Sequence, residues 1–403
     1  MGAVSVVLVG AHGHGRAHLR NIRRLVRQGG ARLAGVCDLV AVPADDLAGL
    51  GEPVQSSDLD ELLERTRPDV AVIATPIQTH ADLAVRALSA GAHVLLEKPP
   101  APRLTEFERI SAAAAETGRA CQIGFQSLGS HAVPAVRALL AEGAVGRVRG
   151  IGVAGAWPRD EAYFRRSAWS GRRRIGEVDV VDGALTNPFA HAVATALAVD
   201  GSERRGEVGR IELELFHANP IESDDTSCLR LRTSRGTVLT VAVSLCAPHR
   251  EEPYLVVHGD AGRITFWYTL DKVTVHRAGA AGHTTTHART DLLENLIDHV
   301  RTGRDLLVPP ERTGAFMEIL DAVRTAPDPL SIPDSEQLVG PSRIDAYGAA
   351  DGVPHRVLPG IHQLVAASAE RLALFSELDV PWARPNARSA APADLSTRPQ
   401  EAR

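Results

Sequence analysis

Aromatic residues, cysteines and long apolar runs are all scarce in this chain of 403 residues. Phe, Trp and Tyr make up 4% of a composition that is otherwise ordinary for a globular protein, with 44% hydrophobic and 23% charged residues. No apolar run approaches the roughly 18 residues that a membrane-spanning helix needs, so we expect no membrane partner. The cysteines show neither CxxC spacing nor a zinc-site pattern with histidine, and we expect them to be reduced and buried: Cys37, Cys121, Cys228 and Cys246.

A large charge of one sign is also absent, because 44 Lys and Arg against 49 Asp and Glu give a net charge of −5. Bulk charge therefore gives no indication of a nucleic-acid partner. The short arginine runs at 165–166 and 172–174 fit a solvated face or a substrate contact better than a phosphate-backbone patch. The first residues lack the basic and apolar segments of a signal peptide, and we expect a cytoplasmic protein. The length is too great for one hydrophobic core and fits two domains with an extension.

The first motif is a buried strand followed by a glycine turn and a helix. Val4–Val9 is an apolar run broken only by Ser5, and Leu19, Ile22 and Leu25 follow at helical spacing. This context is typical of dinucleotide binding, in which backbone N–H groups at a helix start approach a pyrophosphate. The match to G-x-G-x-x-G is imperfect, since glycine is displaced from position 12 to position 13. We expect the turn to bind the cofactor through Gly10, His12, Gly13, His14 and Gly15.

Three histidines, His12, His14 and His18, lie close together in this segment. The spacing of a glycine loop does not make them converge, so we expect no metal site. Asp38 ends the second strand roughly 20 residues beyond the glycines, where an acid accepts hydrogen bonds from the adenine ribose. Its neighbour is Leu39 rather than arginine, which favours NAD over NADP. The alternative is that Asp38 only caps the following turn.

Strands and helices then alternate up to residue 124 without hairpins, which predicts a parallel, doubly wound sheet of about five β-α repeats. The strand His93–Leu96 runs directly into Glu97-Lys98-Pro99-Pro100. Proline offers no backbone N–H to a sheet, so the chain must turn here, at the carboxyl edge where open α/β sheets bind ligands. Lys98 is therefore a candidate proton donor or acceptor. The alternative is an ordinary surface lysine ahead of a loop.

Successive strands without helices, from residue 210 to 276, predict a mainly antiparallel sheet in a second domain. We expect domain bounds at 1–123 and 124–330, followed by a C-terminal extension at 331–384 with a helix over 364–378. The extension has no assigned function. Residues 385–403 lack periodicity and are expected to be disordered.

In their order along the chain, these motifs resemble the glucose–fructose oxidoreductase, inositol dehydrogenase and MocA family of sugar and cyclitol dehydrogenases. The resemblance covers residues 4–325 and rests on Val9-Gly10 through His18, Cys37-Asp38, Ala74-Thr75-Pro76 with His80, Ala90-Gly91 with His93-Val94, and Glu97-Lys98-Pro99. It implies an N-terminal Rossmann domain that binds NAD, and a C-terminal α/β domain whose open sheet often mediates oligomerisation, giving a homodimer or homotetramer. It also implies that Lys98 is catalytic and that the next peptide bond is often cis. The expected cofactor site further includes Thr75, Pro76, His80, Glu97, Lys98 and Gln126.

Aromatic and arginine side chains gather early in the second domain. Two of the four tryptophans and one of the four tyrosines lie between residues 157 and 169. Aromatic faces and guanidinium groups suit the C–H surfaces and hydroxyls of a polyol. We therefore expect substrate contacts from Trp157, Arg159, Tyr163, Arg166 and Trp169. The alternative is a loop that packs over the sheet.

The block from Asp182 to His191 resembles the family pattern G-G-x-L-x-D-x-G-x-H and opens a helix predicted to run through residue 197. His191 matches the family histidine, but position 187 holds Asn where the family has Asp. The spacing i, i+4 places Asn187 and His191 on one helical face, toward the substrate. Asn187 can orient a hydroxyl but cannot take a proton. The alternative for His191 is a histidine satisfied locally at a helix start.

The sequence thus predicts an NAD-dependent oxidoreductase that transfers hydride between the cofactor and a secondary alcohol of a sugar, cyclitol or glycoside. Lys98 and His191 are its predicted acid and base. Two alternatives stay open, namely redox-assisted glycoside cleavage with NAD and a non-enzymatic NAD-binding regulatory protein of the same fold.

Overall fold

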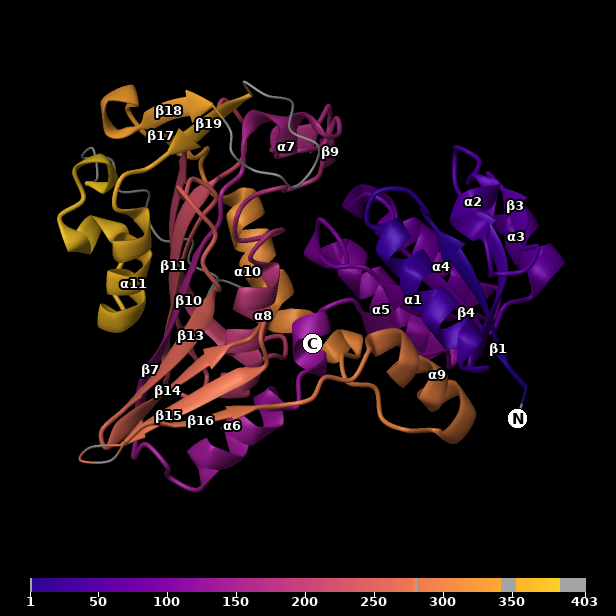
Figure 1. The fold of residues 1–403 in the computed structure, drawn as a ribbon, viewed down its shortest axis with the longest axis horizontal. Helices are drawn as coiled ribbons and strands as arrows, with labels where there is room; N and C mark the ends of the chain where they lie inside the picture. Colours follow the sequence, from indigo (N-terminus) through magenta and orange to yellow (C-terminus); the bar gives the residue numbers. More distant parts are fainter. Residues whose placement is uncertain (1, 278, 280, 342–352, 385–403) are drawn as a thin grey trace, which may run out of the picture.

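The protein folds into two lobes, each built on one sheet (Figure 1). The computed structural model describes residues 2–277, 279, 281–341 and 353–384, so the tail expected at 385–403 lies outside the described residues. A six-stranded parallel sheet forms the first lobe, and a nine-stranded sheet forms the second. This agrees with the predicted doubly wound sheet followed by a mainly antiparallel one.

The first sheet has the strand order β3-β2-β1-β4-β5-β6, with the chain reversing direction of travel at β1. Its strands are short apolar runs, and β1 and β4 are buried along their whole length because helices cover both faces. The short strand β3 was not predicted, because half-exposed residues break its apolar pattern. The bounds are β1 Val4–Val9, β2 Ala31–Cys37, β3 Val54–Ser56, β4 Val70–Ile73, β5 His93–Leu96 and β6 Cys121–Ile123.

The helices of this lobe begin and end where local chemistry favours it. Asp58 caps α3 by accepting hydrogen bonds from the N–H groups of Asp60 and Glu61. Gly118 ends α5 in the left-handed conformation. The bounds are α1 Gly15–Arg27, α2 Ala44–Leu47, α3 Leu59–Thr66, α4 His80–Ser89 and α5 Leu104–Thr117.

The second sheet has the order β16-β15-β14-β13-β7-β12-β11-β10-β17. Neighbouring strands are antiparallel except for the pairs β7–β12 and β10–β17, which are parallel. Its strands are β7 Val148–Ala156, β10 Val208–His217, β11 Thr226–Thr233, β12 Val238–Ser244, β13 Tyr254–Gly259, β14 Gly262–Trp267, β15 Lys272–Arg277, β16 His283–Thr286 and β17 Leu330–Ser331. Two small pairs lie outside it, β8 Arg174–Ile175 with β9 Val178–Asp179, and β18 Leu338–Pro341 with β19 Pro354–Val357.

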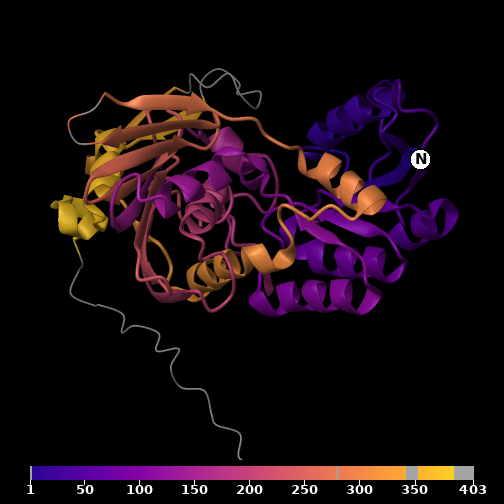
Figure 2. The same cartoon turned by 90° about the horizontal axis from the view of Figure 1, so that it is seen from below.

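Helices on the inner face of this sheet join the two lobes. The helix α8, Ala190–Asp200, is alanine-rich and buried on nearly all sides, and α10, Gly314–Thr325, packs against it and against α5 of the first lobe. Figure 2 shows α9, Leu292–Thr302, lying on the first lobe, where it contacts β5. The chain therefore returns to the first lobe after completing most of the second sheet. The remaining helices are α6 Ala132–Ala141 and α7 Glu161–Arg165.

The outer face of the second sheet is covered by the C-terminal extension. Helix α11, Ile361–Arg371, packs on β7 and β12, where alternate outward positions hold small residues. At Gly152 the approach is so close that an added Cβ atom would lie 1.9 Å from the carbonyl oxygen of Ala369. The predicted helix over 364–378 was wrong at both ends. It stops where Leu372 adopts a left-handed conformation, and a separate 3-10 turn follows at Phe375–Leu378.

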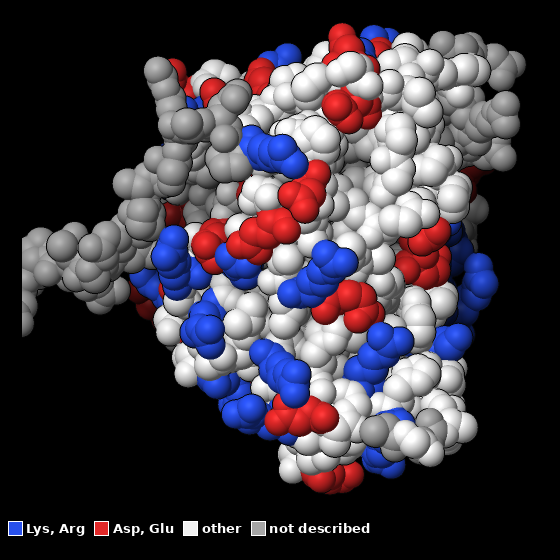
Figure 3. Space-filling model, turned by 90° about the vertical axis from the view of Figure 1, so that its left-hand side faces the viewer, with Lys and Arg blue, Asp and Glu red and all other residues white. Residues whose placement is uncertain are grey.

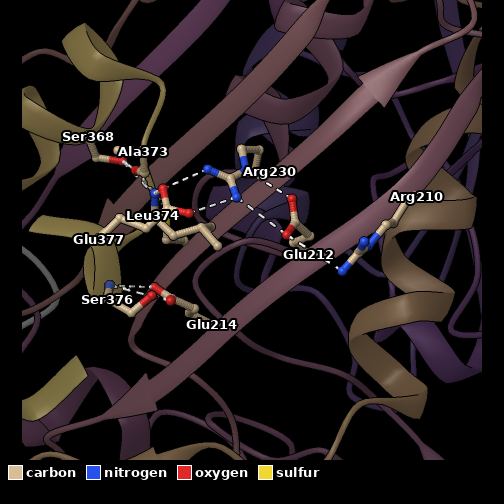
Figure 4. A network of polar contacts seen from close by, with 10 residues as sticks. Arg210, Glu212, Glu214, Arg230, Ser368, Ala373, Leu374, Ser376 and Glu377 are labelled. Atoms are coloured by element: carbon tan, nitrogen blue, oxygen red, sulfur yellow. Dashed lines mark hydrogen bonds and ion pairs between the residues drawn. The ribbon is translucent and has the colours of Figure 1, made fainter. Parts of the chain in front are cut away.

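Polar contacts also hold the extension to the sheet. Figure 3 shows this side of the molecule, where both basic and acidic side chains are spread over the face. Beneath them, Arg230 of β11 lies between Glu212 of β10 and Glu377 of the extension, with nitrogen–oxygen distances of 2.9 and 2.6 Å (Figure 4). The N–H of Ser376 also donates to Glu214. A planar guanidinium that engages two carboxylates fixes geometry better than a single exposed ion pair does.

Three further expectations can be compared with the structure. All four cysteines are free and buried, as predicted. The Lys98–Pro99 peptide bond is cis, as the family resemblance implied. Among the described residues, no helix combines the length and the apolar character needed to cross a membrane.

The contact at Gly152 yields a stability prediction. Gly152→Ala forces the backbone of α11 away from β7, and we expect the free energy of unfolding to fall by about 1–3 kcal/mol or more. Gly340→Ala is the matched control, because nothing lies within 4 Å of the added Cβ atom there. Thermal and urea unfolding of both variants measure the effect. Equal stability of the two variants would show that α11 does not pack as described.

Candidate active site

The site forms where β5 ends and the second domain reaches over the sheet. Lys98 Nζ donates hydrogen bonds to Asn187, at 3.0 Å from its backbone oxygen and 2.6 Å from its side-chain oxygen. Lys98, Asn187 and His191 are each partly exposed, although most residues around them are buried.

Asn187 continues this contact to a buried carboxylate. Its side-chain N–H donates to Asp182 Oδ1 at 2.5 Å, and Asp182 Oδ2 accepts from the N–H of Gly171 at 2.8 Å. Arg166 lies 3.7 Å from the same carboxylate. The amide of Asn187 thus connects the ammonium of Lys98 to the acid of Asp182.

Burial and charge act in opposite directions on these two groups. Burial lowers the pKa of Lys98 from its usual 10.5, while the negative charges of Glu97 and Asp182 oppose that shift. Burial likewise raises the pKa of Asp182 from 3.8, and Arg166 opposes the rise. The pKa of Lys98 therefore lies closer to neutral pH than that of an exposed lysine, which suits a general acid or base.

His191 lies in the same electrostatic neighbourhood. Burial and the charge of Lys98 lower its pKa to about 3, so the imidazole is neutral at pH 7. Its ring stands edge-on to Phe125, and Nδ1 lies 3.3 Å from the hydroxyl of Ser127. When Ser127 donates this bond, the ring proton resides on Nε2, where it can be donated to a ligand oxygen.

The expected shared helical face of Asn187 and His191 was wrong. Helix α8 begins at Ala190, and residues 184–189 form turns. Asn187 lies in this turn, and its N–H bonds to the carbonyl of Gly183. The turn rather than a helix places its side chain against Lys98.

Glu97 anchors the glycine loop to the end of β5. Its Oε1 accepts from His18 at 2.8 Å and from Gln126 at 3.1 Å, and it lies 3.4 Å from His14 Nε2. Burial alone would raise the pKa of Glu97, but the bonds from His14 and His18 outweigh burial and hold the pKa well below 4.5. The hydrogen bond to Glu97 raises the pKa of His14 in turn. Contrary to the spacing argument, two of the three loop histidines therefore converge, on this carboxylate.

The glycine turn fits a pyrophosphate. Gly10 has φ +83°, and a Cβ atom there would lie 2.7 Å from the oxygen of Ala74; at Gly15 it would meet the carbonyl of Gly10. Only glycine allows this close path of the backbone. The first turn of α1 holds no acidic residue of its own, and its positive end faces the glycine turn.

Asp38 lies at the end of β2, beside the glycine turn. Its Oδ2 accepts from the N–H of Ala11 at 2.7 Å, and its Oδ1 accepts from the N–H of Val40. Leu39 next to it is 91% exposed, so an apolar surface adjoins the carboxylate. His12 also reaches this corner, with Nε2 3.2 Å from the carbonyl of Val40. The carboxylate of Asp38 and the exposed Leu39 thus lie at the same corner of the lobe as the glycine turn.

His80 connects two loops next to the site. Its two ring nitrogens lie 2.8 Å from the carbonyl oxygens of Pro99 and Thr75, and burial lowers its pKa. His80 thus holds the loop at 75–76 to the turn that carries Lys98. Thr75 borders Gly10, while Gly13 has open space around it.

In the aromatic segment, arginine side chains from the same segment pack against the aromatic rings. The guanidinium carbon of Arg166 lies 3.7 Å from the ring centre of Tyr163 and 4.8 Å from that of Trp169. Arg159 lies 4.8 Å from the Tyr163 ring on the same measure. Trp157 packs on Phe189, with ring centroids 4.5 Å apart. Among the five expected substrate residues, Arg166 lies next to the Lys98 network, since its guanidinium is 3.7 Å from the carboxylate of Asp182.

Two contributors were not predicted, Asp182 and Ser127. Asp182 belongs to the block that pointed to His191, and an acid ahead of that turn was the available signal. Ser127 carried no signal, because its contact with His191 joins residues 64 positions apart.

Solved structures share this fold over most of the chain. The WlbA dehydrogenase from Bordetella pertussis, in complex with NADH and UDP-GlcNAcA, is 22% identical with a TM-score of 0.65, covering 80% of this chain and 95% of that one. An aldose-aldose oxidoreductase from Caulobacter crescentus is 18% identical with a TM-score of 0.65, covering 80% and 96%.

Sequence relatives match different shares of the chain. A 4-carboxy-2-hydroxymuconate-6-semialdehyde dehydrogenase from Sphingobium is 30% identical over 30% of this chain and 37% of its own length. A dTDP-3,4-didehydro-2,6-dideoxy-alpha-D-glucose 3-reductase from Streptomyces violaceoruber is 35% identical over 36% and 40%. The match to these two relatives therefore spans less than half of their length. Inositol 2-dehydrogenase 2 from Paenarthrobacter aurescens is 29% identical over 61% of this chain and 70% of its own.

Two family models match adjacent parts of the chain. Residues 4–125 match the model of an oxidoreductase family with an NAD-binding Rossmann fold, and residues 133–265 match the GFO/IDH/MocA C-terminal domain. The order of the two matches is the order of the two lobes. The chain therefore belongs to the GFO/IDH/MocA oxidoreductase family, with an NAD-binding Rossmann domain at its N-terminal end.

Proposed function

We propose that the protein is an NAD-dependent dehydrogenase that oxidises a secondary alcohol of a sugar, cyclitol or glycoside, or reduces the corresponding ketone. The observation that carries this proposal is Lys98, held at the carboxyl end of β5 between Asn187 and the glycine turn. Relatives named as inositol and sugar-nucleotide enzymes support the substrate class.

The glycine turn, Asp38 and Glu97 with its histidines would hold NAD, whose nicotinamide accepts or returns a hydride. Asp38 binds the adenosine ribose and, as a carboxylate, repels the 2′-phosphate of NADP. No cation follows it in sequence, because the next residue is Leu39.

In oxidation, neutral Lys98 takes the proton of the substrate hydroxyl while the hydride leaves the same carbon. Asn187 accepts hydrogen bonds from Nζ and so directs the remaining position of that nitrogen toward the substrate. His191, neutral at pH 7, donates a hydrogen bond to the reacting oxygen, which makes it an orienting group rather than the main base. In reduction, the ammonium returns the proton.

The homodimer or homotetramer stays part of the proposal. Helix α11 covers β7 and β12 on the outer face of the sheet. A subunit interface on that face would therefore include the extension.

Lys98→Met tests the acid–base assignment. We expect turnover of the best substrate to fall about 10²- to 10⁴-fold, because no other group replaces the proton acceptor. Lys272→Met is the control, since Lys272 is the other lysine in the chain and lies on β15. NADH fluorescence titration checks that both variants still bind the cofactor. Unchanged turnover in Lys98→Met would remove Lys98 from the chemistry.

Asn187→Asp and Asp182→Asn test the electrostatics around Lys98. A new carboxylate at position 187 raises the pKa of Lys98, so the oxidation rate should rise at a higher pH. Loss of the carboxylate at position 182 lowers that pKa, so the oxidation rate should rise at a lower pH. The pH dependence of kcat from pH 6 to 10.5 is the measurement. Shifts in the same direction for both variants would contradict the assignment.

Asp38→Asn tests cofactor choice. The amide oxygen can still accept from Ala11, but the charge that repels a 2′-phosphate is gone. We expect the ratio of kcat/KM for NAD to that for NADP to fall about 10-fold, or ~1.4 kcal/mol. An unchanged ratio would mean that Asp38 only fixes the turn.

A substrate panel separates this reaction from its alternatives. NADH accumulation in step with ketone formation is expected with sugars, inositols and glycosides. Release of an aglycone without net NADH would indicate redox-assisted cleavage, and NAD binding without turnover of any polyol would indicate a regulatory protein.

A further inference from the structure

A second group of histidines lies where the C-terminal extension meets the loop after β12. His249 and Glu251 lie on this loop, and His362 is the second residue of α11. Ligand atoms from the three side chains all lie within 4.8 Å of one another. His249 Nε2 is 3.2 Å from Glu251 Oε1, and His362 Nδ1 is 3.3 Å from Glu251 Oε2.

These separations are those of ligands that share one small ion. With metal–ligand distances of about 2.1 Å, neighbouring ligand atoms of a tetrahedral site lie about 3.4 Å apart. The two imidazole rings are tilted by 35° with centroids 4.6 Å apart, so both rings face the same carboxylate from adjacent positions. Little movement is needed to bring three donors onto one ion.

The group combines a buried donor with two accessible ones. The side chain of His362 is 11% exposed, whereas those of His249 and Glu251 are 65% and 55% exposed. In the described part of the chain, the buried Nε2 of His362 has no hydrogen-bond partner. A metal ion held with Glu251 would not satisfy that nitrogen, because the atom of His362 that faces Glu251 is Nδ1. The accessible pair gives an ion from solvent a path to it.

We propose that His249, Glu251 and His362 bind one divalent transition-metal ion of the zinc type. Two imidazoles and one carboxylate are a ligand set that zinc uses, and the fourth position is left for water. The ion would fasten the start of α11 to the loop before β13. It would act as a structural clasp, distant in the chain from the residues that carry the proposed chemistry.

The clasp would also reach a candidate substrate residue. Trp157 Nε1 donates to the carbonyl oxygen of Glu251 at 3.1 Å, and Arg250 lies 4.5 Å from the Trp157 ring centre. The segment 249–251 thus contacts Trp157 on one side and α11 on the other. Metal binding would couple the position of Trp157 to that of the extension.

Among the described residues, His14, His18 and Glu97 form another group of possible ligands, but their carboxylate is already engaged. Glu97 already accepts from His18, Gln126 and the N–H of Lys98. That cluster belongs to the cofactor turn.

The test is isothermal titration calorimetry of ZnCl2 into the full chain after removal of metals with EDTA. We expect one ion per chain with a dissociation constant in the micromolar range or below. His249→Ala and Glu251→Gln each remove an exposed ligand and are expected to weaken binding at least about 10-fold. His283→Ala, an exposed histidine on β16, is the matched control and should bind as the wild type does.

A second measurement follows the structural consequence. Hydrogen exchange of the amides in α11 should slow on addition of Zn²⁺ in the wild type and not in His249→Ala. No binding up to about 100 μM Zn²⁺, or equal binding by wild type and His249→Ala, would overturn the proposal. Loss of binding in His14→Ala instead would assign the ion to the cofactor turn and overturn it as well.

Discussion

The contact between Lys98 and Asn187 is the constraint on which the candidate site depends. It joins a strand end of the first lobe to a turn of the second, and both oxygens of Asn187 accept from the same ammonium. The rigid sheet supplies one partner, and the buried helix α8 directly after the turn supplies the other. A charged group between two lobes is expensive to bury unless it is paired. The contact with Asn187 therefore links the two lobes at Lys98, and burial there lowers the pKa of the ammonium.

The family resemblance implies a carboxylate at position 187, where this chain has Asn, and Asp182 brings a carboxyl group close to Lys98 instead. Asp182 supplies the negative charge from five residues earlier, and Asn187 lies between it and Lys98. The negative charge of Asp182 is therefore separated from the ammonium of Lys98 by one side chain, and the amide of Asn187 orients the ammonium. His191 then remains neutral, because burial and the charge of Lys98 both oppose its protonation. Under the proposed function, Lys98 would carry the acid–base work and His191 would orient the substrate.

Much of the fold could be predicted from the sequence, because short stretches of residues determine many of its helices, strands and turns. The apolar strands, the glycine turn, the motif at Glu97-Lys98-Pro99 and the alternation of the second sheet all placed elements correctly. What could not be predicted depends on distant contacts. Asp182 gained its role through a turn that the sequence suggested to be helical, His14 and His18 converge on a carboxylate from another strand, and α11 ends where Leu372 reverses the chain. The small residues of β7 allow α11 to pack closely. In the sequence they indicate only an alternating strand, and their role becomes clear only from the packing of the helix.

The ionisation of Lys98 tests the central claim most directly. Since Lys98 and Lys272 are the only lysines in the sequence, protein grown with lysine labelled by ¹³C at Cε gives two side-chain signals, and Lys98→Met identifies one of them. Titration of that signal by NMR measures its pKa without reference to any substrate. The account predicts a pKa below 10.5, lowered further by Asp182→Asn and raised by Asn187→Asp. A pKa at or above 10.5 that neither substitution changes would contradict it.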